Sequence, residues 1–247
     1  MSTLRAAYLN ELYKLSKKKK ITVALLLAVF AVAAASLIIY GVNSFAGIRI
    51  TGSSEFSVLV LTVLSYTLLP LFTAFVCIAM FSGEFADNTI KSTLTGPAPR
   101  IKVFTAKVLA IATFIIADLL LIMLVSVAAS VLLNGWTVRM LRVLISYAAA
   151  FFPLLIFALL VIAISNTVKG PTGAFMLSVL VFLTFIGLGF AFPGVKSFMF
   201  TSNFDWYRLL LGSYINFSKV LRVFLILSGY GIMLFGLGYY LFDKKEF

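Results

Sequence analysis

The chain has 247 residues, of which 62% are apolar, 15% aromatic and only 11% charged. Soluble domains carry about 25% charged residues, so this composition excludes an ordinary soluble protein and indicates an integral membrane protein. The net charge of +12 is spread along the chain, which favours anionic membrane lipids over nucleic acid as its partner. Histidine is absent and Cys77 is the single cysteine, which excludes histidine-based catalysis, an intramolecular disulfide and the usual metal sites.

Six apolar runs are long enough to cross a membrane, since one span needs about 20 apolar residues. They are residues 21–41, 57–81, 108–133, 143–164, 171–193 and 223–242. We therefore expect an all-α membrane protein with a single transmembrane domain over residues 1–247, whose first span is a retained helix and not a cleaved signal peptide. Six spans place both termini on one side of the membrane. The basic tail at Arg5, Lys14 and residues 17–20 makes that side cytoplasmic by the positive-inside rule, which predicts a multi-pass protein of the plasma membrane.

The residues before the first span show the periodicity of an amphipathic helix. Apolar side chains recur at spacings of four, four and three, and the opposite face is polar; the apolar set is Leu4, Tyr8, Leu12 and Leu15, and the polar set is Asn10, Lys14 and Lys17. This pattern predicts a helix in the inner membrane interface. The alternative is a basic tail that only fixes the topology.

A polar stretch over residues 83–107, GEFADNTIKSTLTGPAPRIKVFTAK, separates the second span from the third. A short helix is expected from Glu84 to Leu94, and Gly96 and Pro97 end it. The order of an acidic residue, a Thr-Ile-Lys-x-x-Leu helix, a Pro and Arg, and a Lys entering the next span resembles the cytoplasmic coupling segment of ABC-2 type transporter permeases. The family pattern usually has Gly before the Thr, where this chain has Asn88.

The resemblance implies a coupling helix that docks on a separate ABC ATPase. Its coupling residues would be Glu84, Asp87, Thr89, Ile90, Lys91, Leu94 and Arg100. The resemblance also implies two ATPase subunits, a second permease copy or a related permease, and ATP and Mg²⁺ bound on the ATPase. The chain has no GxxxxGK[ST] phosphate loop, so we expect neither an ATPase site nor a cofactor of its own. The alternative is an ordinary cytoplasmic loop whose basic residues only set the topology.

Asp118 is the only formally charged residue deep within a predicted span. At the helical rise it lies about 15 Å from the cytoplasmic start of the third span. A charge at this depth is costly, so Asp118 is a candidate for the translocation pathway. Three states are possible: a protonated carboxyl, a hydrogen bond to Ser65, Tyr66 or Ser126, or a position in a wet cavity.

The segment from Gly194 to Arg222 is the longest on the predicted external side, and its aromatic residues follow helical spacing with Leu210. This pattern predicts an interfacial or re-entrant helix, or simply an aromatic belt anchor. In ABC-2 permeases the region before the last span often forms short re-entrant helices that close the pathway. The resemblance therefore makes Trp206, Tyr214 and Phe217 candidates for an external gate.

These features together predict the transmembrane subunit of an ATP-binding cassette exporter. The apolar spans and the 25 Phe residues favour an amphipathic or lipophilic cargo, such as a peptide, a lantibiotic or a drug-like molecule. Permeases of this size with separate ATPases resemble those of peptide export and immunity. One alternative is a secondary transporter or channel that uses Asp118, and another is a membrane subunit that recruits an ATPase without moving cargo.

Overall fold

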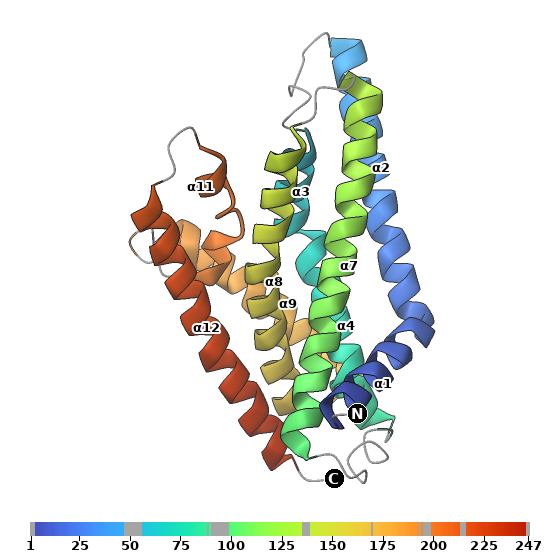
Figure 1. Ribbon diagram of the computed structural model, residues 1–247, viewed down its shortest axis with the longest axis vertical. Helices are drawn as coiled ribbons and strands as arrows, with labels where there is room; N and C mark the ends of the chain where they lie inside the picture. Colours follow the sequence, from blue (N-terminus) through green and yellow to red (C-terminus); the bar gives the residue numbers. More distant parts are fainter. Residues whose placement is uncertain are drawn as a thin grey trace.

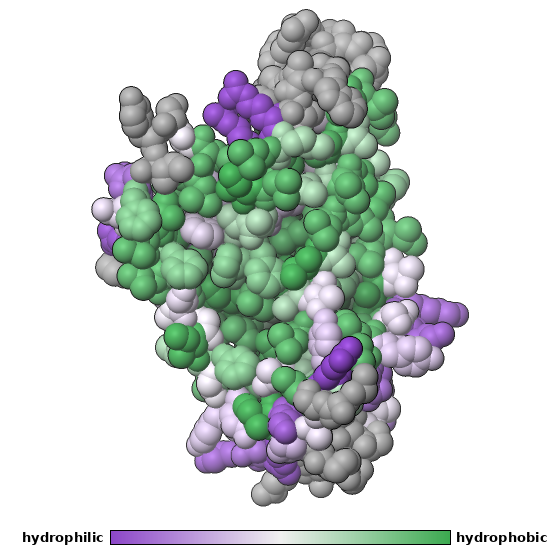
Figure 2. All heavy atoms as spheres, in the orientation of Figure 1, coloured by the Kyte–Doolittle hydropathy of each residue, from purple (hydrophilic) through white to green (hydrophobic). Residues whose placement is uncertain are grey.

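The computed structural model describes residues 3–46, 56–87, 89, 99–134, 139–168, 170–192, 194, 199–212 and 216–245. Every regular element among them is helical. Six segments within these ranges are long and apolar enough to cross a membrane, which confirms the all-α class and the expected number of membrane-capable helices. Figure 2 shows apolar side chains over the middle of one face and hydrophilic ones toward its ends, as a membrane-spanning bundle requires.

The long helices are α2 (Lys19–Ala46), α7 (Arg100–Asn134), α8 (Met140–Thr167), α9 (Pro171–Ala191) and α12 (Phe217–Lys244). The helix α8 packs against α4 (Leu68–Met80), α7, α9 and α12, and α7 also packs against α2. Figure 1 accordingly shows α8 between α7 and α12. Asn216 begins α12, because its side chain accepts the backbone N–H of Lys219 at 3.2 Å.

The second span is interrupted, although the sequence predicts one continuous run over residues 57–81. The helix α3 (Phe56–Tyr66) ends before Thr67, and α4 begins at Leu68. Pro70 explains the break, because proline has no N–H to donate to the carbonyl of Tyr66 four residues earlier. With the helix restarted at Leu68, Pro70 lies in the first turn of α4, where that missing donor costs little.

The predicted N-terminal helix is present as α1 (Thr3–Lys17) and packs against α7. Tyr8 and Leu12 of the predicted apolar face pack against the core, and Leu15 is buried. The hydroxyl groups of Tyr8 and Thr113 lie 2.7 Å apart. The apolar face therefore contacts protein, while Leu9 on the outer side of α1 is exposed.

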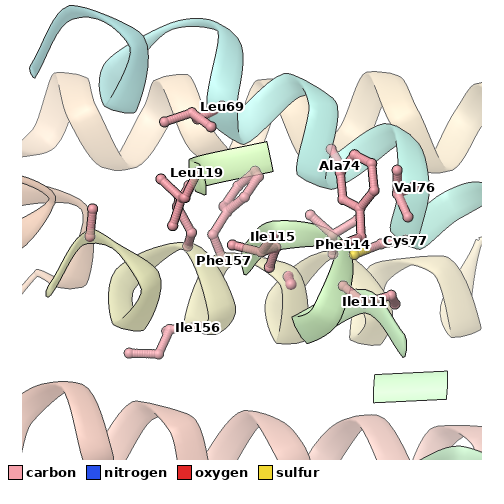
Figure 3. Close-up of a cluster of buried hydrophobic side chains, with 14 of the residues drawn as sticks. Leu69, Ala74, Val76, Cys77, Ile111, Phe114, Ile115, Leu119, Ile156 and Phe157 are labelled. Carbon is pink, nitrogen blue, oxygen red and sulfur yellow. The ribbon is translucent and has the colours of Figure 1, made fainter. Parts of the chain in front are cut away.

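The helix α1, the start of α7 and the last turn of α12 lie at the same end of the bundle (Figure 1). We call it the α1 end. Two short elements, η1 (Phe200–Asn203) and α11 (Arg208–Leu211), lie toward the opposite end, called the α11 end. The core between them joins α4, α7 and α8 (Figure 3), and its labelled members are Leu69, Ala74, Val76, Cys77, Ile111, Phe114, Ile115, Leu119, Ile156 and Phe157.

Candidate functional site

Five charged side chains from four segments of the chain meet at the α1 end, and two of them belong to α1. Lys107 of α7 is at their centre and is fully buried. Its Nζ donates to Glu84 Oε2 at 2.6 Å, to Glu11 Oε2 at 2.9 Å and to the Met80 carbonyl at 3.2 Å. The three donors of one ammonium group are therefore all used, which is what a buried lysine needs.

Two further lysines complete this group, which we call the ion cluster (Glu11, Lys14, Lys18, Glu84 and Lys107). Lys14 Nζ donates to Glu11 Oε1 at 2.8 Å. Lys18, in the turn between α1 and α2, lies 3.6 Å from Glu84 Oε1 and donates to the Ala79 carbonyl at 2.9 Å. Three ammonium groups thus surround two carboxylates, so the ionised cluster carries one excess positive charge.

The environment shifts the pKa of two members of the ion cluster. Burial works against ionisation of Glu11, but Lys107 and Lys14 outweigh it, and the pKa of Glu11 lies below its ordinary value. Burial lowers the pKa of Lys18, and the positive charge of Lys107 adds to this effect while Glu84 opposes it. The carboxylate of Glu11 is therefore ionised at neutral pH and holds α1 against α7.

The position of Glu84 follows from a turn at the end of the second span. Phe81 separates α4 from the short helix α5 (Ser82–Ala86), with φ −105° and ψ −80°. This turn places Glu84 against α7 and leaves it only 4% exposed. The next residue, Phe85, lies under the ammonium group of Lys245, whose Nζ is 3.9 Å from the ring centroid, and burial lowers the pKa of Lys245. The helix α5 is thus held on one side by the ion cluster and on the other by the end of α12.

Two further contacts join the helices at the α1 end. The guanidinium of Arg100, at the start of α7, contacts both the carbonyl and the carboxylate of Asp243 near the end of α12. Lys102 Nζ donates to Thr3 Oγ1 at 2.7 Å and ties α7 to the first turn of α1. The beginning of α7 is therefore fixed to both terminal helices of the chain.

The structure separates the predicted coupling residues into three groups. Glu84 and Arg100 form ion pairs with other helices of this chain. Asp87 and Thr89 are exposed, and the Thr89 hydroxyl donates to the Glu84 carbonyl at 3.4 Å. The remaining three, Ile90, Lys91 and Leu94, lie outside the described residues. Of the ion cluster, the sequence predicted Glu84 as a coupling residue and noted Lys107 just as the Lys that enters the next span, and it did not place Glu11, Lys14 or Lys18 in the site. The available signal was the place of Glu11 beside the apolar face of α1, where a charged residue needs a partner.

The segment with η1 and α11 packs into the α11 end of the bundle. Trp206 is buried, and its Nε1 donates to the Ala149 carbonyl of α8 at 2.8 Å. The hydroxyl groups of Tyr207 and Thr62 lie 2.8 Å apart, which ties the segment to α3. Of the other gate candidates, Phe217 is 71% exposed and Tyr214 lies outside the described residues.

Asp118 is 2% exposed, and its Oδ1 accepts no hydrogen bond within the described structure. None of the three expected hydroxyl groups donates a hydrogen bond to this oxygen. Tyr66 donates to Asp205 at 3.2 Å, and Ser126 contacts the Tyr147 hydroxyl at 3.0 Å. The Ser65 hydroxyl is itself buried without a partner. A hydrogen bond from one of these hydroxyl groups, one of the three states considered for Asp118, is therefore not formed, because Tyr66 and Ser126 are turned to other groups.

Comparison with known families gives a match over most of the chain. The model of a family described as ABC-2 family transporter protein matches residues 8–189. This range runs from α1 into α9, so it includes every member of the ion cluster and Asp118. The comparison with curated proteins gave no match.

Proposed function

Because the chain belongs to the ABC-2 transporter family, we propose that this transmembrane permease is the membrane subunit of an ATP-driven exporter whose ATPase is a separate protein. The single observation that carries the coupling mechanism is the buried contact of Glu84 with Lys107. It joins the segment that enters the expected ATPase-docking region to the third membrane span.

In this mechanism the ATPase contacts the region between α5 and α7, which begins with the exposed residues Asp87 and Thr89. Closure of the ATPase around nucleotide displaces α5. Glu84 is bonded to Lys107 and Lys18, and Phe85 to Lys245, so α5 cannot shift without pulling on α7, α1 and α12. Glu84 thus acts inside the permease as a positioning residue. The surface that docks on the ATPase consists of Asp87, Thr89, Ile90, Lys91 and Leu94.

The α1 end is the cytoplasmic end in this proposal, and both termini lie in the cytoplasm. The excess positive charge of the ion cluster and the neighbouring Lys17 and Lys19 support this orientation under the positive-inside rule. The α11 end is then external. There the buried contacts of Trp206 and Tyr207 with α8 and α3 support a role for residues 200–211 as the closure of the pathway.

A functional complex would contain two ATPase subunits, with ATP and Mg²⁺ bound on them, and a second permease copy or a related permease. Apolar side chains on α9 and α12 support a protein or lipid contact on these helices, since Leu180, Leu183 and Ile232 are exposed. The cargo is an amphipathic or lipophilic molecule, such as a peptide, lantibiotic or drug-like compound. The apolar spans with their many Phe residues support this class.

The test is purification of the tagged chain from its native membrane in mild detergent, followed by identification of the proteins that accompany it. We expect an ABC ATPase with the wild type and with the control Lys219→Ala, which changes an exposed residue at the start of α12. Leu94→Asp should lose the ATPase. The triple variant Lys107→Met, Glu84→Gln and Glu11→Gln, which removes the central contacts without leaving unpaired buried carboxylates, should retain the ATPase but lose ATP-driven transport into inside-out vesicles. Absence of any ATPase from well-folded wild-type protein would overturn the proposal.

The same experiment separates the alternative functions. A secondary transporter that uses Asp118 would move cargo without ATP and would tolerate Leu94→Asp. A subunit that only recruits an ATPase would bind the ATPase yet show no ATP-dependent uptake of amphipathic peptides into inside-out vesicles. ATP-dependent uptake by the wild type that is lost in Leu94→Asp is the result that supports the exporter.

A further inference from the structure

The buried carboxyl group of Asp118 has an oxygen atom without a hydrogen-bond partner in the part of the chain that the structure describes. Most buried polar atoms in folded proteins have a hydrogen-bond partner, so each exception needs an explanation. Asp118 Oδ1 and Ser65 Oγ are two such exceptions, and both residues are almost fully buried. They belong to α7 and α3, two helices that pack against each other.

A tyrosine fixes the register between these two helices. The Tyr147 hydroxyl of α8 lies 3.0 Å from Ser126 Oγ of α7 and donates to the Ser57 carbonyl of α3 at 3.3 Å. Ser57 and Ser126 therefore lie at the same depth. Ser65 comes eight residues after Ser57 and Asp118 eight residues before Ser126, and α3 and α7 run in opposite directions (Figure 1). At the helical rise both residues lie about 12 Å further toward the α1 end, so they share one depth.

The break in the second span lies at this same depth. The helix α3 ends at Tyr66, one residue after Ser65. Thr67 covers part of that end, since its N–H donates to the Leu64 carbonyl and its hydroxyl to the Val63 carbonyl. Pro70 cannot donate to the carbonyl of Tyr66. Leu69 after the break and Leu119 beside Asp118 belong to the same core cluster (Figure 3).

A helix carboxyl end carries partial negative charge, and broken helices in membranes use such ends to coordinate cations. We propose that Asp118, the Ser65 hydroxyl and the carboxyl end of α3 form a binding site for a monovalent cation within the membrane. Asp118 supplies the compensating charge, and the hydroxyl and carbonyl oxygens replace part of the hydration shell. When the cation binds, the Asp118 carboxyl group releases its proton to the surrounding water, so that the carboxylate balances the charge of the bound cation.

The charge of the site selects a monovalent cation over a divalent one. Protein sites for Ca²⁺ combine several oxygen ligands that commonly include more than one carboxylate. Among the described residues no group of three acidic, His or Cys side chains is placed to hold a metal, and Asp118 has no acidic residue beside it on its own helix. One carboxylate among neutral oxygens balances a single positive charge. Both an inorganic ion such as Na⁺ and a protonated primary amine on a cargo molecule carry a single positive charge that this site would balance.

The test uses the purified chain in detergent without ATP, so its failure would leave the ATPase coupling untouched. NaCl, KCl and hexylammonium chloride each replace choline chloride at constant ionic strength. Thermal unfolding reports binding, and infrared difference spectra report the carbonyl stretch of a protonated carboxyl group. We expect one of these cations to raise the melting temperature of the wild type and to remove that band. The active salt identifies an inorganic ion or an amine as the source.

Three variants decide whether the response belongs to this site. The isosteric Asp118→Asn should lose both the thermal and the infrared response, and Ser65→Ala should bind the cation about tenfold more weakly. Ser178→Ala is the matched control, because it removes a buried hydroxyl of α9 that donates to Ala174, and it should respond as the wild type does. If Asp118→Asn unfolds, Asp118→Glu keeps the charge and should restore the infrared response. A wild type that responds to none of the salts, or an Asp118→Asn that responds fully, would overturn the proposal.

Discussion

Lys107 and Glu84 form an ion pair of 2.6 Å that is buried on both sides, although the two residues lie at opposite ends of the polar stretch between two spans. The pair closes that stretch into a loop whose two ends are fixed to each other. Glu11 joins the same ammonium group from α1. A force applied anywhere along the loop therefore reaches α1 and α7 together, which is the property that a coupling element needs.

Loss of the central ammonium group should destabilise the chain strongly. Lys107→Met leaves two buried carboxylates without their shared partner, and breaking a buried pair in this way costs about 3–5 kcal/mol. The measurement is the free energy of unfolding in mixed detergent micelles. The triple variant Lys107→Met, Glu84→Gln and Glu11→Gln removes the orphaned charges and should recover part of the loss. Equal instability of the single and triple variants would contradict the role assigned to the charges.

Acid should release α1 from the bundle. The pKa of Glu11 is below the ordinary value of 4.5 in the folded chain, so its contribution to stability is present above that ordinary value and is lost as the pH falls through the folded pKa. A spin label on Leu9→Cys, an exposed position of α1, should become more mobile over this range. Glu11→Gln should show high mobility at every pH. A profile that is identical with and without Glu11 would assign the release to another group.

The sequence was sufficient for the spans and insufficient for the contacts between them. Hydropathy is a property of contiguous residues, so the runs that form α2, α7, α8, α9 and α12 were predictable from the length of each apolar stretch. The contact between Glu11 and Lys107 joins residues 96 positions apart, and no local pattern encodes it. The break at Thr67 was partly predictable. Pro70 indicates that the helix is disturbed, but it does not specify the residue at which the next helix begins.

Trp206 should be the anchor of the segment that covers the α11 end. Trp206→Phe keeps most of the buried ring but loses the donor to the Ala149 carbonyl, which costs about 1 kcal/mol for a neutral hydrogen bond. Trp206→Ala also leaves a cavity and should increase hydrogen exchange across residues 200–211. Phe217→Ala is the control, since that ring is exposed and its loss should leave the exchange unchanged. An equal effect at both positions would rule out the anchoring role.

Glycine at position 238 sets how closely α12 approaches α7 and α8. A Cβ there would lie 3.3 Å from Phe104 Cζ and 3.6 Å from Ile162 Cγ2, so Gly238→Leu must push the helices apart. Overpacking of this kind costs about 1–3 kcal/mol. Phe104 contacts Phe81 and Phe242, which connects the strain to α5 and the ion cluster, and transport should fall together with stability. Gly236→Leu is the matched control on the same helix, because nothing lies within 4 Å of a Cβ at that position, and it should retain both. If Gly236→Leu were as damaging as Gly238→Leu, the cause would be the helix itself and not its approach to Phe104.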